Sequence, residues 1–457
     1  MRHGFPVEIV EARSDSLGSL ADWLAAGSYR TERRQVGDLG RLATGARVRL
    51  VEVTAEESAA RLAGLTRRGA GEHVAVAAIV AEGDEISLSK ALAIGPDDLL
   101  TWPFDEEELK TRLDALQQLG RGRAVLAERA RTFARFAPPD GRLAGSARPG
   151  DGAHRRRAAG AERPRVLVIG PASQHKVKVG EALARTAINY ADNLEKAKGA
   201  LETGGFDMVV LLGTNPAARR DLWRWPELAG SAFPVTLLVL DAASGTDRLE
   251  ARQRLAQLPV ADRLTLPQPA ELVRARMDFW LAFVRLQRGL LDPPGDDLRH
   301  LCHDGLTGLF NHGFFLEHLR QLQVEPGERR ALVVLELVNL PRMNESVGYA
   351  AVNRYLAALG PALRRNVRAE DLPAHLGCGR FAVLLDDVAP YTATRIGRRL
   401  EQLLAQLPEA RAQLPHTATA PRLTASSLEL ASATPALQQL HELLRWRRLE
   451  GNAVSAA

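Results

Sequence analysis

The segment Asp304-Gly305-Leu306-Thr307-Gly308-Leu309-Phe310-Asn311-His312 opens the C-terminal part of this 457-residue chain. Its Leu-Thr-Gly-Leu core, taken alone, is compatible with an ordinary turn. The elements that follow it in order are an apolar strand at Ala331–Leu337, a helix at Val352–Arg365, a hairpin at Leu376–Leu385 and an amphipathic helix at Ala436–Arg448. Strands that alternate with amphipathic helices predict an α/β domain, which we place at residues 293–457.

Two further units with the same strand–helix alternation precede this domain. Their apolar strand-like segments are Val7–Val10, Val48–Val53, Val74–Val80, Val166–Ile169, Met208–Leu212 and Val235–Leu240. Short apolar strands between amphipathic helices predict parallel sheets with helices on both faces. Residues 138–164 are rich in Gly, Ala, Pro and Arg and lack apolar periodicity, which predicts a flexible linker. We therefore expect one domain at 1–137 and a second at 165–292.

Composition narrows the class of protein. Hydrophobic residues make up 46% of the chain and charged residues 25%, as in globular proteins. No apolar run is long enough to insert into a membrane, the N-terminus lacks a signal-peptide apolar region, and two cysteines form no disulfide framework. We therefore expect a cytoplasmic protein. The net charge of +5 is small for this length and no nucleic-acid-binding motif occurs, so we expect no nucleic-acid partner.

The opening segment resembles the Asp-x-Leu-Thr-Gly-Leu-x-Asn-Arg motif of GGDEF domains. Asn344-Glu345 is similar to the family's Asn-Asp pair, and Gly348-Tyr349 is similar to its Gly-His pair. The endings of the first two units, Trp102-Pro103 and Leu266-Pro267, resemble receiver domains, in which Lys-Pro follows the last strand. The order of two receiver-like units followed by a GGDEF-like domain resembles the domain order of PleD-type response regulators. The resemblance implies an α/β chain with two receiver-like doubly wound (βα)5 domains and a GGDEF domain with a mainly antiparallel central sheet.

The family's signature hairpin departs from its usual form. Gly-Gly-Asp/Glu-Glu-Phe stands here as Gly377-Cys378-Gly379-Arg380-Phe381. Cyclases of the family join two GTP molecules and need two carboxylates to hold Mg²⁺. Glu336 could supply the first carboxylate, whereas Gly379 has no side chain and Arg380 is a cation. We therefore expect a degenerate relative that is not an enzyme and requires no metal or cofactor. With the two receiver-like units before it, such a domain resembles PopA-type members of the family.

Two possible nucleotide contacts remain in this domain. Asn344 matches a guanine contact of the family, so residual nucleotide binding stays open. Arg368-Ala369-Glu370-Asp371 is separated from Gly377 by five residues, which is the form and spacing of the family's Arg-x-x-Asp inhibitory site. A guanidinium can bond phosphate or guanine, and a carboxylate can accept from guanine N–H groups. The resemblance implies a cyclic di-GMP site at Arg368 and Asp371, and the alternative is an ordinary surface ion pair.

A third arginine commonly completes this site in the family. Alignment past the hairpin places it at Arg399, and Arg395 and Arg398 are close enough to take the same role. In the receiver-like units the phosphoacceptor aspartate aligns with Glu52 and with Leu212 (or its neighbour Gly213). We therefore expect no phosphoacceptor, and we interpret both units as modules for protein interaction and dimerisation.

The resemblance as a whole implies a cyclic di-GMP effector or adaptor in bacterial cell-cycle signalling. It would act as a homodimer that recruits protein partners through its receiver-like domains, among them protease adaptors and a response-regulator substrate, and it would be recruited to a cell pole. Two alternatives stay open. One is a diguanylate cyclase or GTP-sensing enzyme with residual activity, and the other is a scaffold that binds no nucleotide.

Overall fold

The computed structural model describes residues 6–13, 15–27, 29–36, 47–57, 62–64, 73–104, 106–137, 163–170, 174–202, 206–212, 235–241, 261–266, 268–291, 296–324, 328–389, 391–416, 418–431 and 434–455. By their contacts the residues form two compact units, one of Met1–Ala124 with Gly160–Arg288 and the other of Val125–Ala159 with Gly289–Ala457. The predicted linker lies outside the described residues except for 163 and 164.

The first sheet and its helices form what we call the first parallel fold. Its elements are β1 Pro6–Glu11, α1 Gly18–Ala26, β2 Arg30–Gln35, β3 Val48–Glu52, β4 Ala75–Ala81, α3 Glu85–Ile94, β5 Asp98–Trp102 and α4 Glu106–Phe136. All of its pairings are parallel, in the order β2-β1-β3-β4-β5, which is a doubly wound arrangement. Alternate residues of β4 join opposite apolar clusters, so both faces of the sheet are covered.

The second parallel fold repeats this order. Its elements are β6 Arg165–Ile169, α6 Gln174–Ala182, β7 Ala187–Ala191, α7 Leu194–Glu202, β8 Met208–Leu212, β9 Val235–Asp241, β10 Asp262–Leu266 and α10 Ala270–Leu291. The strands again pair in parallel, in the order β10-β9-β8-β6-β7. The expectation of two parallel α/β folds in the N-terminal region is confirmed.

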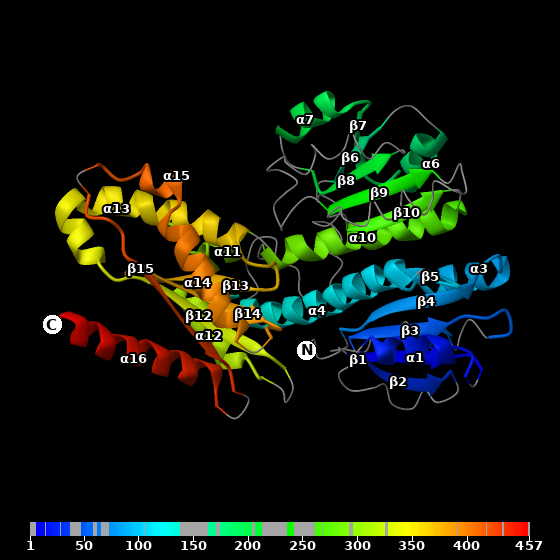
Figure 1. The fold of residues 1–457 in the computed structure, drawn as a ribbon, viewed down its shortest axis with the longest axis horizontal. Helices are drawn as coiled ribbons and strands as arrows, with labels where there is room; N and C mark the ends of the chain where they lie inside the picture. The colour runs from blue at the N-terminus through cyan, green and yellow to red at the C-terminus, as the bar shows by residue number, and fades with distance from the viewer. Residues whose placement is uncertain are drawn as a thin grey trace. The chain divides into compact units, whose positions relative to one another are not determined.

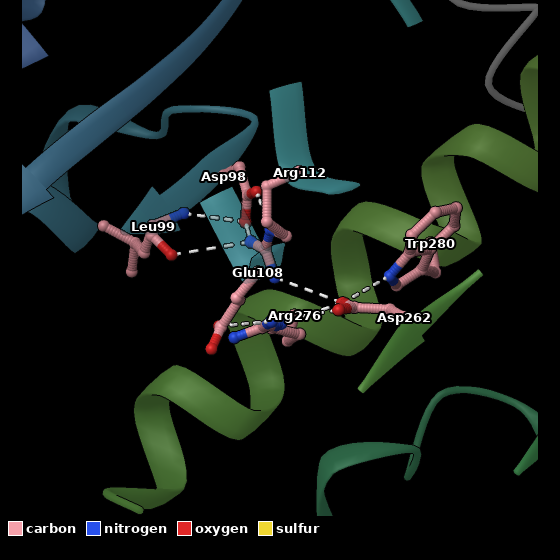
Figure 2. A network of polar contacts seen from close by, with 7 residues as sticks. All are labelled: Asp98, Leu99, Glu108, Arg112, Asp262, Arg276 and Trp280. Carbon is pink, nitrogen blue, oxygen red and sulfur yellow. Dashed lines mark hydrogen bonds and ion pairs between the residues drawn. The ribbon is translucent and has the colours of Figure 1, made fainter. Parts of the chain in front are cut away.

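A buried polar network joins the two parallel folds, and Figure 2 shows it from close by. Asp262 at the start of β10 accepts from Arg276 Nε at 2.8 Å, from Trp280 Nε1 at 2.9 Å and from Arg112 Nη1 at 3.2 Å. Arg112 also forms an ion pair with Asp98 at the start of β5. Asp98 and Asp262 each begin the last strand of their fold, and each bonds the arginine 14 residues later in the chain. The two parallel folds therefore share this aspartate–arginine pair as well as their strand order.

The C-terminal fold has a mixed sheet. Its strands are β11 Phe310–Asn311, β12 Arg330–Leu337, β13 Leu372–Gly377, β14 Arg380–Asp386 and β15 Leu423–Glu429. Its helices are α11 Asp296–Cys302, α12 His312–Gln321, α13 Leu340–Arg365, α14 Thr392–Ala405, α15 Pro408–Arg411 and α16 Ala436–Ser455. The order is β11-β13-β14-β12-β15, and of the described pairings only β11 with β13 is parallel. The predicted, mainly antiparallel central sheet is confirmed.

Helices cover both faces of this sheet (Figure 1). Residues of α13 and α14 share one apolar cluster with every second residue of β12, and residues of α12 and α16 share another with the residues between. The opening segment forms a tight turn, in which Asp304 accepts from the Thr307 backbone N–H at 2.8 Å. Helix α13 approaches this turn so closely that a Cβ at Gly360 would lie 2.1 Å from the Thr307 carbonyl oxygen. In the described part of the chain, no helix combines the length and apolar character needed to cross a membrane.

Candidate functional site

The hairpin between β13 and β14 ends in a two-residue turn made by Cys378 and Gly379. Both residues have positive φ, 52° at Cys378 and 71° at Gly379. Positive φ at both central residues is what a type I′ turn requires, and such turns match the right-handed twist of the flanking strands. Glycine adopts it without cost, whereas a residue with a Cβ is strained there. The turn therefore tolerates Gly379 well and holds Cys378 in an unfavourable conformation.

Gly379 also has little space for a side chain. A Cβ at this position would lie 3.2 Å from Leu337 Cβ and 3.3 Å from Leu340 Cδ2. These distances are tighter than ordinary van der Waals contacts, so leucine side chains crowd the place from which an acid would project. The hairpin residue expected to lack a carboxylate is thus also enclosed by apolar groups.

Arg380 lies opposite Glu336 in the register of β14 and β12. Its Nε is 3.4 Å from Glu336 Oε1, and each side chain is 27% exposed. A guanidinium beside the remaining carboxylate neutralises the charge that would attract Mg²⁺. Among the described residues, no group of three or more His, Cys, Asp and Glu side chains is arranged to hold a metal ion.

Asn344 lies in α13, shortly before the break in this helix at Gly348, where φ is 78°. The Asn344 side-chain oxygen is buried and has no hydrogen-bond partner among the described residues. A buried amide oxygen without a partner is costly, because it loses its hydrogen bonds to water. This acceptor is therefore available for a donor from a bound molecule.

The segment Arg368–Asp371 forms the turn that leads into β13, and we call it the Arg368 turn. Arg368 is exposed, whereas Asp371 is only 5% exposed. One Asp371 carboxylate oxygen accepts from the Arg368 backbone N–H at 2.9 Å, and the other accepts from the Asp386 N–H at 3.1 Å. Burial raises the pKa of Asp371 to about 6. The expectation that this carboxylate faces a ligand is therefore not met in this conformation. Asp371 instead stabilises the turn, because its two carboxylate oxygens accept hydrogen bonds from the backbone N–H groups of Arg368 and Asp386.

Arg399 on α14 lies next to the Arg368 turn. Its Nη2 donates to the Asn366 carbonyl oxygen at 2.8 Å, two residues before Arg368. Arg395 and Arg398 on the same helix are also exposed. The structure thus brings Arg399 to the chain segment that carries Arg368, and both side chains are exposed to solvent.

Arg129 is a residue of this region that the sequence did not indicate. It lies on α4, 240 residues before Ala369, and its side chain donates to backbone carbonyls of the Arg368 turn. In a chain with 60 lysine and arginine residues, one more arginine on a helix carries no distinguishing pattern. Only the fold reveals this contact.

In the first parallel fold, Glu52 ends β3 and Glu11 ends β1. Glu52 accepts from the Ala12 N–H at 2.8 Å and from the Ser16 hydroxyl. Glu11 is bonded by both Nε and Nη2 of Arg33. These acids are thus occupied by donors of the protein itself, and an arginine provides the positive charge beside them.

In the second parallel fold, Leu212 ends β8 and is 1% exposed. The alternative position Gly213 lies outside the described residues. An apolar buried side chain cannot accept a phosphoryl group.

Residues 301–443 match the family described as diguanylate cyclase, GGDEF domain. Over 343 residues the chain is 25% identical to the response regulator PleD of Caulobacter vibrioides, covering 73% of this chain and 70% of PleD. Over 101 residues it is 36% identical to the probable diguanylate cyclase DgcE of Escherichia coli, covering 21% of this chain and 9% of DgcE.

Two solved GGDEF structures also resemble part of this chain. One is the GGDEF domain of DgcB from Caulobacter crescentus in complex with c-di-GMP, with 16% identity, a TM-score of 0.29 and coverage of 34% of this chain and 90% of that chain. Another is the FimX GGDEF domain from Pseudomonas aeruginosa, with 20% identity, a TM-score of 0.27 and coverage of 31% and 87%. The sequence matches identify residues 301–443 as a GGDEF domain, in a chain that is similar to the response regulator PleD over most of its length.

Proposed function

We propose that this chain is a PopA-type, non-catalytic GGDEF protein that binds cyclic di-GMP at the Arg368 turn and recruits partner proteins in response. The observation that carries the non-catalytic part is the packing at Gly379. A metal-binding carboxylate is missing there, and Leu337 and Leu340 crowd the position from which it would project. Arg380 beside Glu336 adds a positive charge where the cyclase reaction needs Mg²⁺.

Cyclic di-GMP binding is supported by the two exposed arginines. Arg368 lies in the turn, and Arg399 contacts the same segment through Asn366. A guanidinium group can form two parallel hydrogen bonds to a phosphate or to the O6/N7 edge of guanine, and it can stack on the plane of a base. Asp371 contributes by holding the turn through two backbone N–H groups, so we assign it a positioning role.

The receiver-like folds are the proposed surfaces for partners. Their acceptor positions hold Glu52 and Leu212, and the acids of the first fold are engaged by Arg33, Ala12 and Ser16. At these described positions neither fold offers an aspartate for phosphorylation, so ligand binding replaces it as the signal in this proposal. We further propose that the chain is a homodimeric cytoplasmic adaptor in cell-cycle signalling that is recruited to a cell pole and delivers a response-regulator substrate to regulated proteolysis.

Calorimetry tests the binding proposal directly. We expect the full chain to bind cyclic di-GMP and the Arg368→Ala variant to bind it at least roughly tenfold more weakly, which corresponds to about 1.4 kcal/mol. Arg354→Ala, which removes an exposed arginine from α13, is the matched control and should bind as wild type does. Equal binding by wild type and Arg368→Ala, or no binding by either, would contradict the proposal.

The unpartnered Asn344 oxygen supports a second candidate, residual binding of a guanine nucleotide at the former active site. GTP titration of wild type and Asn344→Ala, with product analysis in the presence of Mg²⁺, tests it. Binding that Asn344→Ala abolishes, without formation of cyclic di-GMP, is the expected result for a nucleotide-sensing site. Product formation would instead establish a cyclase and overturn the non-catalytic proposal.

A further inference from the structure

Arg129 lies on the last part of α4, within the compact unit that contains the C-terminal fold. Its side chain is fully buried, with 1% of the residue exposed. Nη2 donates to the carbonyl oxygen of Glu370 at 2.7 Å and to that of Asp371 at 3.0 Å. Nη1 donates to Ala369 at 3.2 Å and also to Leu290. One guanidinium therefore holds three successive carbonyls of the Arg368 turn.

This contact depends on the shape of the turn. Successive carbonyls of an extended chain point in opposite directions, so three can converge on one group only in a particular turn conformation. Arginine suits this task because its planar fork offers several donors in fixed directions, whereas lysine is a point charge on a flexible stem. The guanidinium also lies 5.9 Å from the centre of the Phe310 ring.

Burial of the charge makes the contact costly to lose. Desolvation lowers the pKa of Arg129 to about 10, so the side chain remains charged at neutral pH. A buried charge that loses its partners destabilises a protein strongly, because water does not replace the lost bonds. Movement of the turn away from Arg129 would leave a buried charge without hydrogen-bond partners. The free-energy cost of that state favours the observed conformation of the turn.

Other contacts fix this part of α4 on the C-terminal fold. Glu128 binds Arg330 through two bonds of 2.8 Å, and Thr132 Oγ1 lies 2.9 Å from His318 Nδ1. The Phe133 ring packs against Phe314 with ring centres 4.6 Å apart. These contacts fix the part of α4 that carries Arg129 relative to the C-terminal fold. The guanidinium of Arg129 can therefore hold the turn in one position.

We propose that Arg129 is a positioning residue for the cyclic di-GMP site. It fixes the turn through its carbonyls, so that Arg368 is presented to the ligand. The inference rests on the proposed function and adds its regulation. Arg129 and the turn lie in the same compact unit, so binding at the turn is coupled to the part of α4 that begins at Val125.

The test compares Arg129→Lys with Arg131→Lys, which changes an exposed arginine two residues further along α4. By calorimetry with cyclic di-GMP on the full chain, we expect Arg129→Lys to bind at least roughly fivefold more weakly, at the lower end of typical coupling between sites. Arg131→Lys should bind as wild type does. Limited trypsin digestion, followed by mass spectrometry, should show faster cleavage after Arg368 in Arg129→Lys and unchanged cleavage after Arg399.

The outcomes separate the two proposals. If wild type binds no cyclic di-GMP, the proposed function fails, and the rate of cleavage after Arg368 still decides whether Arg129 positions the turn. If wild type and Arg129→Lys bind equally well, the positioning inference is overturned while the proposed function stands. If Arg129→Lys does not fold, hydrogen exchange on wild type decides instead. Ligand should then slow exchange in residues 125–136 as well as in the turn, and protection of the turn alone would overturn the inference.

Discussion

Arg380 of β14 and Glu336 of β12 face each other across the antiparallel ladder, with Arg380 Nε 3.4 Å from Glu336 Oε1. In a GGDEF hairpin with its usual sequence, a carboxylate stands at the position of this arginine. The pairing converts a place that would concentrate negative charge into a neutral ion pair. Because Gly379 next to it is enclosed by leucines, two independent features oppose metal binding.

Restoring the acids should therefore not restore a cyclase. We expect the double variant Gly379→Asp, Arg380→Glu to form no cyclic di-GMP from GTP and Mg²⁺, because an aspartate at Gly379 meets Leu337 and Leu340 and requires a φ of 71°. Chromatography of the reaction products is the measurement, with Arg380→Glu alone as the control. Product formed by the double variant would show that the site is open to an acid.

Cys378 should be a point of local strain that glycine relieves. A left-handed conformation costs a residue with a Cβ about 1–2 kcal/mol, and the greater freedom of glycine in the unfolded chain offsets about 0.4–1 kcal/mol of the gain. We expect Cys378→Gly to raise the free energy of unfolding by roughly 0.5–1 kcal/mol. Urea denaturation measures it. Cys378→Ala keeps the strain and should be close to wild type, so an equal gain in both variants would contradict the argument.

His318 should make the C-terminal fold sensitive to acid. Burial, with Arg129 and Arg330 nearby, lowers the pKa of His318 from 6.5 to about 3. As the pH falls below 6.5, the unfolded chain takes up this proton before the folded one does. Stability is therefore present above the unfolded pKa and is lost, by up to about 1.4 kcal/mol per pH unit, as the pH falls towards the folded value.

The measurement is urea denaturation between about pH 6 and about pH 4, the window in which this linkage acts. We expect His318→Asn to lose less stability across this range than wild type does. His441→Asn, at an exposed position on α16, is the control and should follow wild type. Parallel curves for wild type and His318→Asn would refute the assignment to His318.

Asp262 should contribute strongly to the free energy of unfolding of the unit that contains the two parallel folds. Its carboxylate accepts bonds from Arg112, Arg276 and Trp280, and it is 3% exposed. Removal of one partner from a buried ion pair typically costs about 3–5 kcal/mol, and we expect a loss of this order for Asp262→Ala by urea denaturation. Glu56→Ala, which breaks the exposed pair with Arg13, should leave the midpoint nearly unchanged. Similar effects of the two variants would mean that the network contributes little.

Much of the fold follows from local pattern. The apolar strands predicted at Val166–Ile169 and Met208–Leu212 are observed as Arg165–Ile169 and Met208–Leu212, because a fully buried parallel strand needs continuous apolar residues. The strands β2 and β7 were not predicted. Both lie at sheet edges and are largely exposed, so their sequences lack the apolar pattern that marks a buried strand.

The hairpin residues were informative for a chemical reason. Gly379 lacks a carboxylate in any fold, and Arg380 is a cation in any environment, so the residue types alone argued against metal binding. The orientation of Asp371 was different. Arg-x-x-Asp spacing predicts proximity, but whether the carboxylate faces solvent or the turn depends on which backbone N–H groups lie nearby, including that of Asp386.

The amino-acid sequence alone determines three features: the succession of sheets, the GGDEF-like character of residues 301–443 and the absence of an acid at position 379. It can do so because periodicity, motif and side-chain type are local properties. Packing settled the rest: Leu337 and Leu340 close around Gly379, Asp371 turns inward, and Arg129 reaches a turn 240 residues away. Such contacts join groups from distant segments, and the free energy of burying polar groups, which decides them, depends on neighbours that the linear chain does not reveal.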